Sequence, residues 1–132
     1  MRILVVEDDF VSRRLLCAFM APYGSCDVAV DGEEAVKAVR LALDDNHPYD
    51  LICLDVMMPN MNGQIALRKI RELEREHEIL VGDGARVIMT TALGDAKNVM
   101  QAFKGDCDAY IIKPIDKAKL IEELQKLGLI KE

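Results

Sequence analysis

The chain has 132 residues, of which 51% are hydrophobic, and a formal net charge of −6. This length predicts a single domain, residues 1–132, with no output domain after it. Basic residues are scattered and aromatics make up only 5%, which argues against direct nucleic-acid binding. No apolar run approaches a membrane span and the start turns acidic too soon for a signal peptide, so we expect a cytoplasmic protein without a membrane partner.

The cysteines give no sign of a metal site. They are Cys17, Cys26, Cys53 and Cys107, and none lies at a metal-finger spacing. We predict that all four are buried free thiols.

The first predicted strand covers residues 3–6 and leads directly into the acidic run 7–9. A solvated acidic loop and a metal site explain this run equally well when it is taken alone. A helix over residues 10–21 should follow. Its apolar spacing predicts that Val11, Leu15 and Ala18 form the core face.

The second strand should cover residues 26–30, where apolar and polar residues alternate as at the edge of a sheet. Asp31 then begins a helix, which ends at the polar residues 44–48. The core face of this helix is predicted to be Val36, Val39 and Leu43.

The third strand, residues 51–54, is apolar throughout and runs into Asp55. Such a run is typical of a strand buried on both faces of a parallel sheet. After a turn that ends at Gly63, a helix should place Ala66, Ile70 and Leu73 inward and Arg71, Glu72, Glu74, Arg75 and Glu76 outward. We expect the connection 77–86 to pack its apolar residues under this helix, and a docking surface is the alternative.

Two more strand–helix pairs complete the chain. The fourth strand, residues 87–89, ends in Thr90-Thr91, and its helix should begin at Asp95 with Val99 and Phe103 inward. The fifth strand, residues 109–112, ends in Lys113-Pro114. Asp116 should cap the last helix, with Leu120, Leu124 and Leu127 inward and Gly128 as its C-cap.

Five strand–helix pairs in strict alternation predict an α/β fold with a parallel five-stranded sheet and helices on both faces. The order 2-1-3-4-5, the flavodoxin-like doubly wound (βα)5 arrangement, fits best. It makes the second strand an edge and places a switch point between strands one and three.

Polar residues follow the strands at one edge of this sheet. They are Glu7, Asp8, Asp55, Thr91 and Lys113. Close carboxylates need a counter-charge or a proton. Lys113 supplies part of the positive charge, and oxygen ligands that retain water suit Mg²⁺. A metal, a nucleophilic carboxylate, a hydroxyl donor and a fixed cation together favour acceptance of a phosphoryl group.

Several motifs at these positions agree in order and spacing with one known family. They are Val5-Val6-Glu7-Asp8, Asp55 with Met58-Pro59, Met61 and Gly63, Thr91-Ala92, and Tyr110-Ile111-Ile112-Lys113-Pro114. Over essentially its whole length, the chain resembles a receiver domain of the two-component response regulators, most closely a stand-alone, chemotaxis-regulator-like one.

The resemblance implies that Asp55 is the phosphoacceptor. Asp8 would bind Mg²⁺ directly, Glu7 would hold it through water, and Asp55 and the carbonyl of Met57 would complete the protein ligands. Lys113 would pair with one phosphoryl oxygen.

For the switch, the resemblance implies that Thr91 donates its hydroxyl to another phosphoryl oxygen and that Tyr110 turns inward. The surface of helix four, strand five and helix five would then change. It also implies a cis Lys113-Pro114 peptide, a histidine kinase or phosphotransfer protein as donor, and a downstream protein as target.

The chain departs from the family pattern at three places. Asn62 replaces a usual aspartate that is not a ligand, and residues 105–109 replace a usual glycine-alanine pair. Met57 and Leu93 flank the path of an attacking water in this family, and neither can hydrogen-bond that water. We therefore expect slow self-hydrolysis, in a protein that is otherwise a switch and not an enzyme.

Three other functions are alternatives for this sequence. A metal-dependent phosphotransferase or nuclease of the topoisomerase-primase type would need a second carboxylate where the chain has Met57. A flavodoxin-like cofactor binder needs a glycine- and hydroxyl-rich phosphate loop, and the acidic run 7–9 would repel phosphate. An adaptor that is never phosphorylated would not need to keep Lys113 and Thr91.

Overall fold

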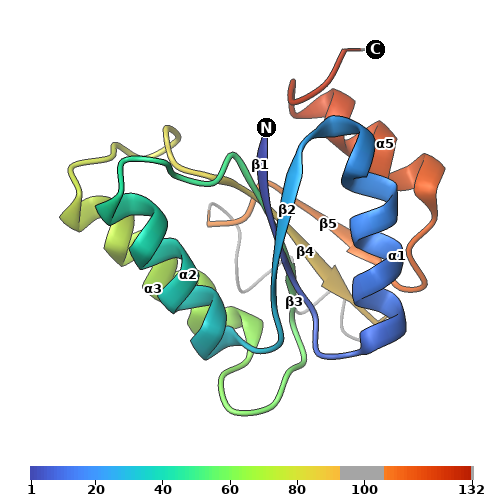
Figure 1. Ribbon diagram of the computed structural model, residues 1–132, viewed down its shortest axis with the longest axis horizontal. Helices are drawn as coiled ribbons and strands as arrows, with labels where there is room; N and C mark the ends of the chain where they lie inside the picture. The colour runs from blue at the N-terminus through green and yellow to red at the C-terminus, as the bar shows by residue number, and fades with distance from the viewer. Residues whose placement is uncertain (93–105, 132) are drawn as a thin grey trace.

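A computed structural model describes residues 1–92 and 106–131 (Figure 1). The strands are β1 (Arg2–Val6), β2 (Ser25–Ala29), β3 (Leu51–Asp55), β4 (Arg86–Thr91) and β5 (Ala109–Ile112). The helices are α1 (Phe10–Met20), α2 (Gly32–Asp44), α3 (Gly63–Glu76) and α5 (Lys117–Lys126), with a short 3-10 helix η1 (Ala21–Tyr23). The helix predicted from Asp95, with Val99 and Phe103, lies outside the described residues.

The five strands form one parallel sheet in the order β2-β1-β3-β4-β5. This confirms the predicted order, including the edge position of β2. Val5 of β1 pairs with Val28 on one side and with Cys53 on the other, so β1 and β3 are neighbours. The carboxyl ends of β1 and β3 therefore lie next to each other at one edge of the sheet.

Two hydrophobic cores lie on opposite faces of the sheet. Leu4, Val6, Ile52 and Leu54 pack with α2 and α3 on one face. Alternate residues of the same strands, such as Ile3 and Cys53, pack with α1 and α5 on the other (Figure 1). Every residue of β3 is buried, as predicted for a strand covered on both sides.

The predicted inward faces of α2 and α3 are confirmed, and so are Leu120 and Leu124 of α5, with Leu127 half-buried. The prediction for α1 is wrong. Val11, Leu15 and Ala18 are exposed, and Leu16 and Met20 are the buried residues. The helix is apolar along more than one stripe, and periodicity alone does not choose between them.

Side-chain caps begin the helices at defined residues. Asp9, Asp31, Asn62 and Asp116 each accept a backbone N–H of the first turn. At the end of α5, Gly128 N–H donates to Gln125 O, and Leu129 N–H donates to Leu124 O. Gly128 has a φ of +74°, so the predicted glycine C-cap is confirmed as a Schellman motif.

The predicted outward position of Glu74 is wrong, because this residue is buried. Its carboxylate accepts Arg71 Nη1 at 2.8 Å and the backbone N–H of Ala85 at 2.8 Å. A glutamate without partners would be expected at the surface, because burial of an unpaired carboxylate is costly. Here the contacts with Arg71 and Ala85 offset that cost.

The connection after α3 follows the prediction only in part. Ile79 packs against the core, but Leu80 and Val81 are 73% and 92% exposed. The ring of His77 lies between Leu73 O at 2.9 Å and Asp44 Oδ1 at 3.0 Å, and so joins α3 to α2. Within residues 1–92 and 106–131, no helix is long and apolar enough to cross a membrane.

Candidate functional site

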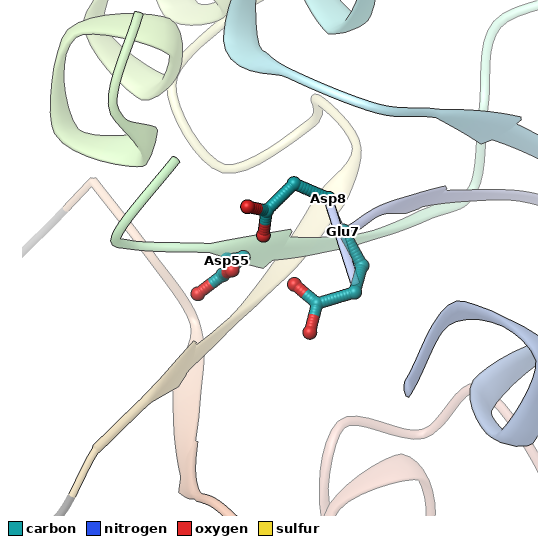
Figure 2. Close-up of side chains that lie close together, drawn as sticks. All are labelled: Glu7, Asp8 and Asp55. Atoms are coloured by element: carbon teal, nitrogen blue, oxygen red, sulfur yellow. The ribbon is translucent and has the colours of Figure 1, made fainter. Parts of the chain in front are cut away.

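Three carboxylates converge at the carboxyl edge of the sheet. Glu7 and Asp8 follow β1, and Asp55 is the last residue of β3. Figure 2 shows the three side chains turned toward one another, and one ligand oxygen from each lies within 4.8 Å of the others. Glu7 and Asp55 are buried, whereas Asp8 is exposed. The predicted convergence of these residues is therefore present.

Lys113 supplies the positive charge in this cluster. Its Nζ lies 2.8 Å from Glu7 Oε1 and 3.2 Å from Asp55 Oδ2. The backbone N–H of Lys113 also donates to Thr91 O at 2.7 Å, which fixes the end of β5 against β4. Its peptide bond to Pro114 is cis, as expected. The contact with Asp55 was expected, but the pairing of Lys113 with Glu7 was not.

The charges of this cluster change one another's proton affinity. Burial, together with a hydrogen bond and the negative charge of Glu7, raises the pKa of Asp55 to about 7, although Lys113 acts in the opposite direction. Burial lowers the pKa of Lys113, but the hydrogen bonds and negative charges of Glu7 and Asp55 raise it by more, so its pKa lies above the ordinary value. Lys113 therefore stays charged at neutral pH, while Asp55 is divided between its protonated and ionised forms.

Close backbone packing holds the loop after β3. Gly63 N–H donates to Val56 O at 2.9 Å, and a Cβ on Gly63 would lie 2.2 Å from the carbonyl oxygen of Asp55. Glycine is therefore required at the start of α3, because any side chain would displace the backbone of Asp55. The backbone N–H of Met57 donates to Asp55 Oδ1 at 3.3 Å and orients the carboxylate.

Thr91 and Tyr110 lie on the neighbouring strands. Asp55 pairs with Thr90, so Thr91 is one residue further along β4. It is buried, and its hydroxyl donates to Ala92 O at 3.4 Å. Tyr110 of β5 is half-buried and pairs with Met89 of β4. It packs against the core on the α2–α3 face. Leu93, expected to flank the site, lies outside the described residues.

Some contacts that support the site were not found from the sequence. Arg13 Nη1 of α1 donates to the backbone carbonyl of Glu7 at 3.0 Å. Asn60 Nδ2 donates to Asp31 Oδ2 at 3.0 Å and joins the loop after β3 to the loop after β2. Arg13 lies only six residues from Glu7, but nothing in its type distinguishes it from the adjacent Arg14.

The donor set fits a hard divalent cation such as Mg²⁺. All three side-chain groups offer carboxylate oxygens, and Asp8 keeps one side of the cluster open to water. Glu7 Oε2 is buried and has no hydrogen-bond partner in the described part of the chain. A buried carboxylate oxygen without a partner is costly, and a hydrated cation would satisfy it.

Comparison with known proteins gives one family. Residues 3–125 match the family described as the response regulator receiver domain. The chemotaxis protein CheY of Treponema pallidum is 33% identical over 125 residues, which cover 93% of this chain and 79% of that protein. The transcriptional regulatory protein ResD of Bacillus subtilis is 35% identical over 127 residues, 96% of this chain and 47% of that protein. The chain spans only 7% of another relative, a hybrid signal transduction histidine kinase of Dictyostelium discoideum.

Solved structures agree in fold. The CheY chain in a CheX-CheY-BeF3-Mg complex from Borrelia burgdorferi matches with a TM-score of 0.78 and 30% identity, over 97% of this chain and 89% of that one. The receiver domain of the sensor histidine kinase PA1611 from Pseudomonas aeruginosa matches with a TM-score of 0.74 and 29% identity, over 95% of this chain and 94% of that one. That structure holds a magnesium ion in its active-site cleft.

Proposed function

Because the chain belongs to the response regulator receiver domain family, we propose that it accepts a phosphoryl group on Asp55 from a phosphohistidine of a histidine kinase or phosphotransfer protein. The observation that carries this proposal is the position of Asp55 Oδ2, 3.2 Å from Lys113 Nζ and beside two further carboxylates. An ionised carboxylate here can attack phosphorus while a fixed ammonium faces the charge that develops on the phosphoryl oxygens.

The proposed transfer is an in-line displacement. One oxygen of Asp55 forms the new bond to phosphorus as the phosphorus–nitrogen bond of the phosphohistidine breaks, and the electron pair returns to the imidazole nitrogen. The Met57 N–H orients the attacking carboxylate, since it donates to Asp55 Oδ1. Lys113 pairs with one transferred oxygen, and the Thr91 hydroxyl donates to another.

We propose that Asp8 and Asp55 hold Mg²⁺ directly, that Glu7 holds it through water, and that the carbonyl of Met57 completes the protein ligands. A bound divalent cation supplies positive charge to the phosphoryl oxygens. The close carboxylates and the unpartnered oxygen of Glu7 support this assignment. The magnesium ion in the cleft of the PA1611 receiver domain gives it further support.

Phosphorylation would change a surface of the protein. In the proposed switch, the Thr91 hydroxyl moves toward the phosphoryl group and Tyr110 turns inward. The surface of β5 and α5 then binds or releases a downstream protein. The relatives support partners of both kinds, because they include receiver domains of histidine kinases and a CheY in complex with CheX.

Receiver domain relatives such as CheY are signalling switches. We extend this to the present chain, whose only reactions would be its own phosphorylation and a slow loss of the phosphoryl group, both in the cytoplasm.

A phosphodonor assay tests the proposal directly. Incubation with a small acyl phosphate and Mg²⁺ should increase the intact mass by one phosphoryl group, and Asp55→Asn should abolish the increase because it removes the nucleophile. Asp83→Asn, in an exposed turn away from the cluster, is the matched control and should be phosphorylated like the parent. Chelation of Mg²⁺ should slow the reaction. Phosphorylation of Asp55→Asn would refute the assignment.

The lifetime of the phosphoryl group gives a second prediction. Met57 is 66% exposed beside Asp55 and cannot hydrogen-bond an attacking water. Met57→Asn should speed phosphate loss roughly tenfold, because one oriented hydrogen bond in the transition state is worth about 1.4 kcal/mol. Phosphate release is timed after the donor is removed. Met57→Leu should leave the rate unchanged, and equal rates for both variants would contradict the explanation.

A further inference from the structure

Cys17 and Cys26 lie close together on the α1–α5 face of the sheet. Cys17 is one turn before the end of α1 at Met20, and Cys26 is the second residue of β2. Only η1 and Gly24 lie between helix and strand, and α1 and β2 contact each other. Both cysteines pack against the same hydrophobic core. The chain therefore brings the two side chains to one location.

The two thiols are free and interact directly, but they are half-buried, so the prediction that all four cysteines are buried is wrong; only Cys53 is buried. Neither is in a disulfide, and a hydrogen bond between them affects the pKa of both. Cys53 lies in the same core but is fully buried, and burial raises its pKa to about 12, so it stays an inert thiol. Cys107 packs with the core on the opposite face of the sheet. The only close thiols that are also accessible to solvent in the described residues are thus Cys17 and Cys26.

We propose that Cys17 and Cys26 form an intrachain disulfide when the protein meets a low-molecular-weight disulfide such as oxidised glutathione. The thiolate of one cysteine attacks a sulfur of the small disulfide and releases one thiolate. The second cysteine then attacks the protein sulfur of the mixed disulfide and releases another. The two cysteines are oxidised, one small disulfide is reduced to two thiols, and the two cysteine protons go to the released thiolates.

The surroundings select Cys17 as the first nucleophile. Burial raises the pKa of both thiols, but Arg13 and Arg14 oppose the rise at Cys17. At Cys26 the negative charge of Asp27 adds to the rise, and the hydrogen bond between the thiols favours the thiolate of Cys17. These charges favour the thiolate of Cys17, so we expect Cys17 to attack first.

A bond between these residues would restrain the helix that supports the acidic cluster. α1 begins two residues after Asp8, and its Arg13 donates to the carbonyl of Glu7. The disulfide would tie the far end of this helix to β2. It closes a loop of about ten residues, which should raise Tm by roughly 5–10 °C, because the crosslink restricts the unfolded chain.

The test uses the full chain in buffers of increasing oxidised-to-reduced glutathione ratio at pH 8, quenched with acid. Intact mass and peptide mapping should show the loss of two hydrogens and a Cys17–Cys26 crosslink, with intrachain disulfide exceeding glutathione adducts roughly tenfold, since neighbouring thiols have a high effective concentration. Cys26→Ser should instead accumulate a glutathione adduct at Cys17.

Other outcomes overturn the proposal. These are a parent protein that stays fully reduced, one that accumulates stable glutathione adducts, or one whose crosslink involves Cys53 or Cys107. If Cys26→Ser does not fold, Cys26→Ala serves the same purpose. The Tm of the oxidised parent, compared with that of Cys17→Ser in the same buffer, separates the crosslink from any general effect of the oxidant.

Discussion

Replacement of Arg71 by methionine should lower the free energy of unfolding by about 3–5 kcal/mol, because it leaves a buried carboxylate without its partner. Arg71 Nη1 lies 2.8 Å from Glu74 Oε1 and donates to Ala85 O at 2.8 Å. Its Nε and Nη2 both donate to Asp106 O. One guanidinium thus joins α3 to the start of β4 and to the segment that enters β5.

Urea denaturation of three variants tests this expectation. The double variant Arg71→Met with Glu74→Gln should have a free energy of unfolding at least about 1 kcal/mol higher than that of Arg71→Met. The amide is neutral, and its oxygen still accepts the Ala85 N–H. Lys126→Met removes an exposed ion pair with Glu122 and should destabilise the protein far less than Arg71→Met does. If Arg71→Met costs no more than Lys126→Met, the network does not stabilise the fold.

Replacement of Lys113 by methionine should have a comparable effect that depends on pH. The variant removes the cation that lies 2.8 Å from Glu7 and 3.2 Å from Asp55. We expect a loss of about 3 kcal/mol at pH 9, because two close carboxylates then face each other without a counter-charge. Lys119→Met, an exposed residue of α5, is the matched control.

The direction of the pH effect follows from Asp55. Its pKa in the folded parent, about 7, lies above the ordinary 3.8, so its contribution to stability is fully present below pH 3.8 and is lost as pH rises through 7. In Lys113→Met the pKa of Asp55 rises further, so the variant goes on losing the stability contribution of Asp55 at pH values above 7. The difference in Tm between variant and parent should therefore be larger at pH 9 than at pH 6.

Mg²⁺ binding provides an independent measurement, on the parent and on Asp8→Asn. A cation that binds only the folded protein raises its stability, by about 2.7 kcal/mol at a hundredfold excess over Kd. Asp8→Asn should weaken this stabilisation because it removes a carboxylate that we propose binds the ion. An equal effect of Mg²⁺ on Asp8→Asn and on the parent would show that Asp8 is not a ligand. A pH-independent difference for Lys113→Met would likewise contradict the role given to Lys113.

The acidic cluster could be predicted from the sequence because strand ends are easy to locate. Apolar runs stop abruptly at Glu7 and at Asp55, and alternating strands and helices dictate a parallel sheet whose carboxyl ends share an edge. The order of the strands then makes the two ends neighbours. What remained hidden was the pairing of Lys113 with Glu7, since the two residues lie 106 positions apart.

The errors fall where the identity of a residue does not determine its surroundings. α1 has apolar side chains around much of its surface, and the choice of Leu16 over Leu15 depends on how the helix is rotated against the sheet. Glu74 is buried because a neighbouring arginine and a backbone N–H satisfy it. Leu80 and Val81 are exposed although their type favours the interior.

The connection from α3 to β4 offers a practical place for a reporter insertion. Glu74 anchors both of its ends, through its carbonyl to Ile79 N–H and through its carboxylate to Ala85 N–H. Between these anchors, Gly82 has a φ of +92° and open space around it. A fluorescent peptide spliced in at Gly82 would project at the amino edge of the sheet, across the molecule from the acids, and would report on the folded chain without obstructing a phosphodonor.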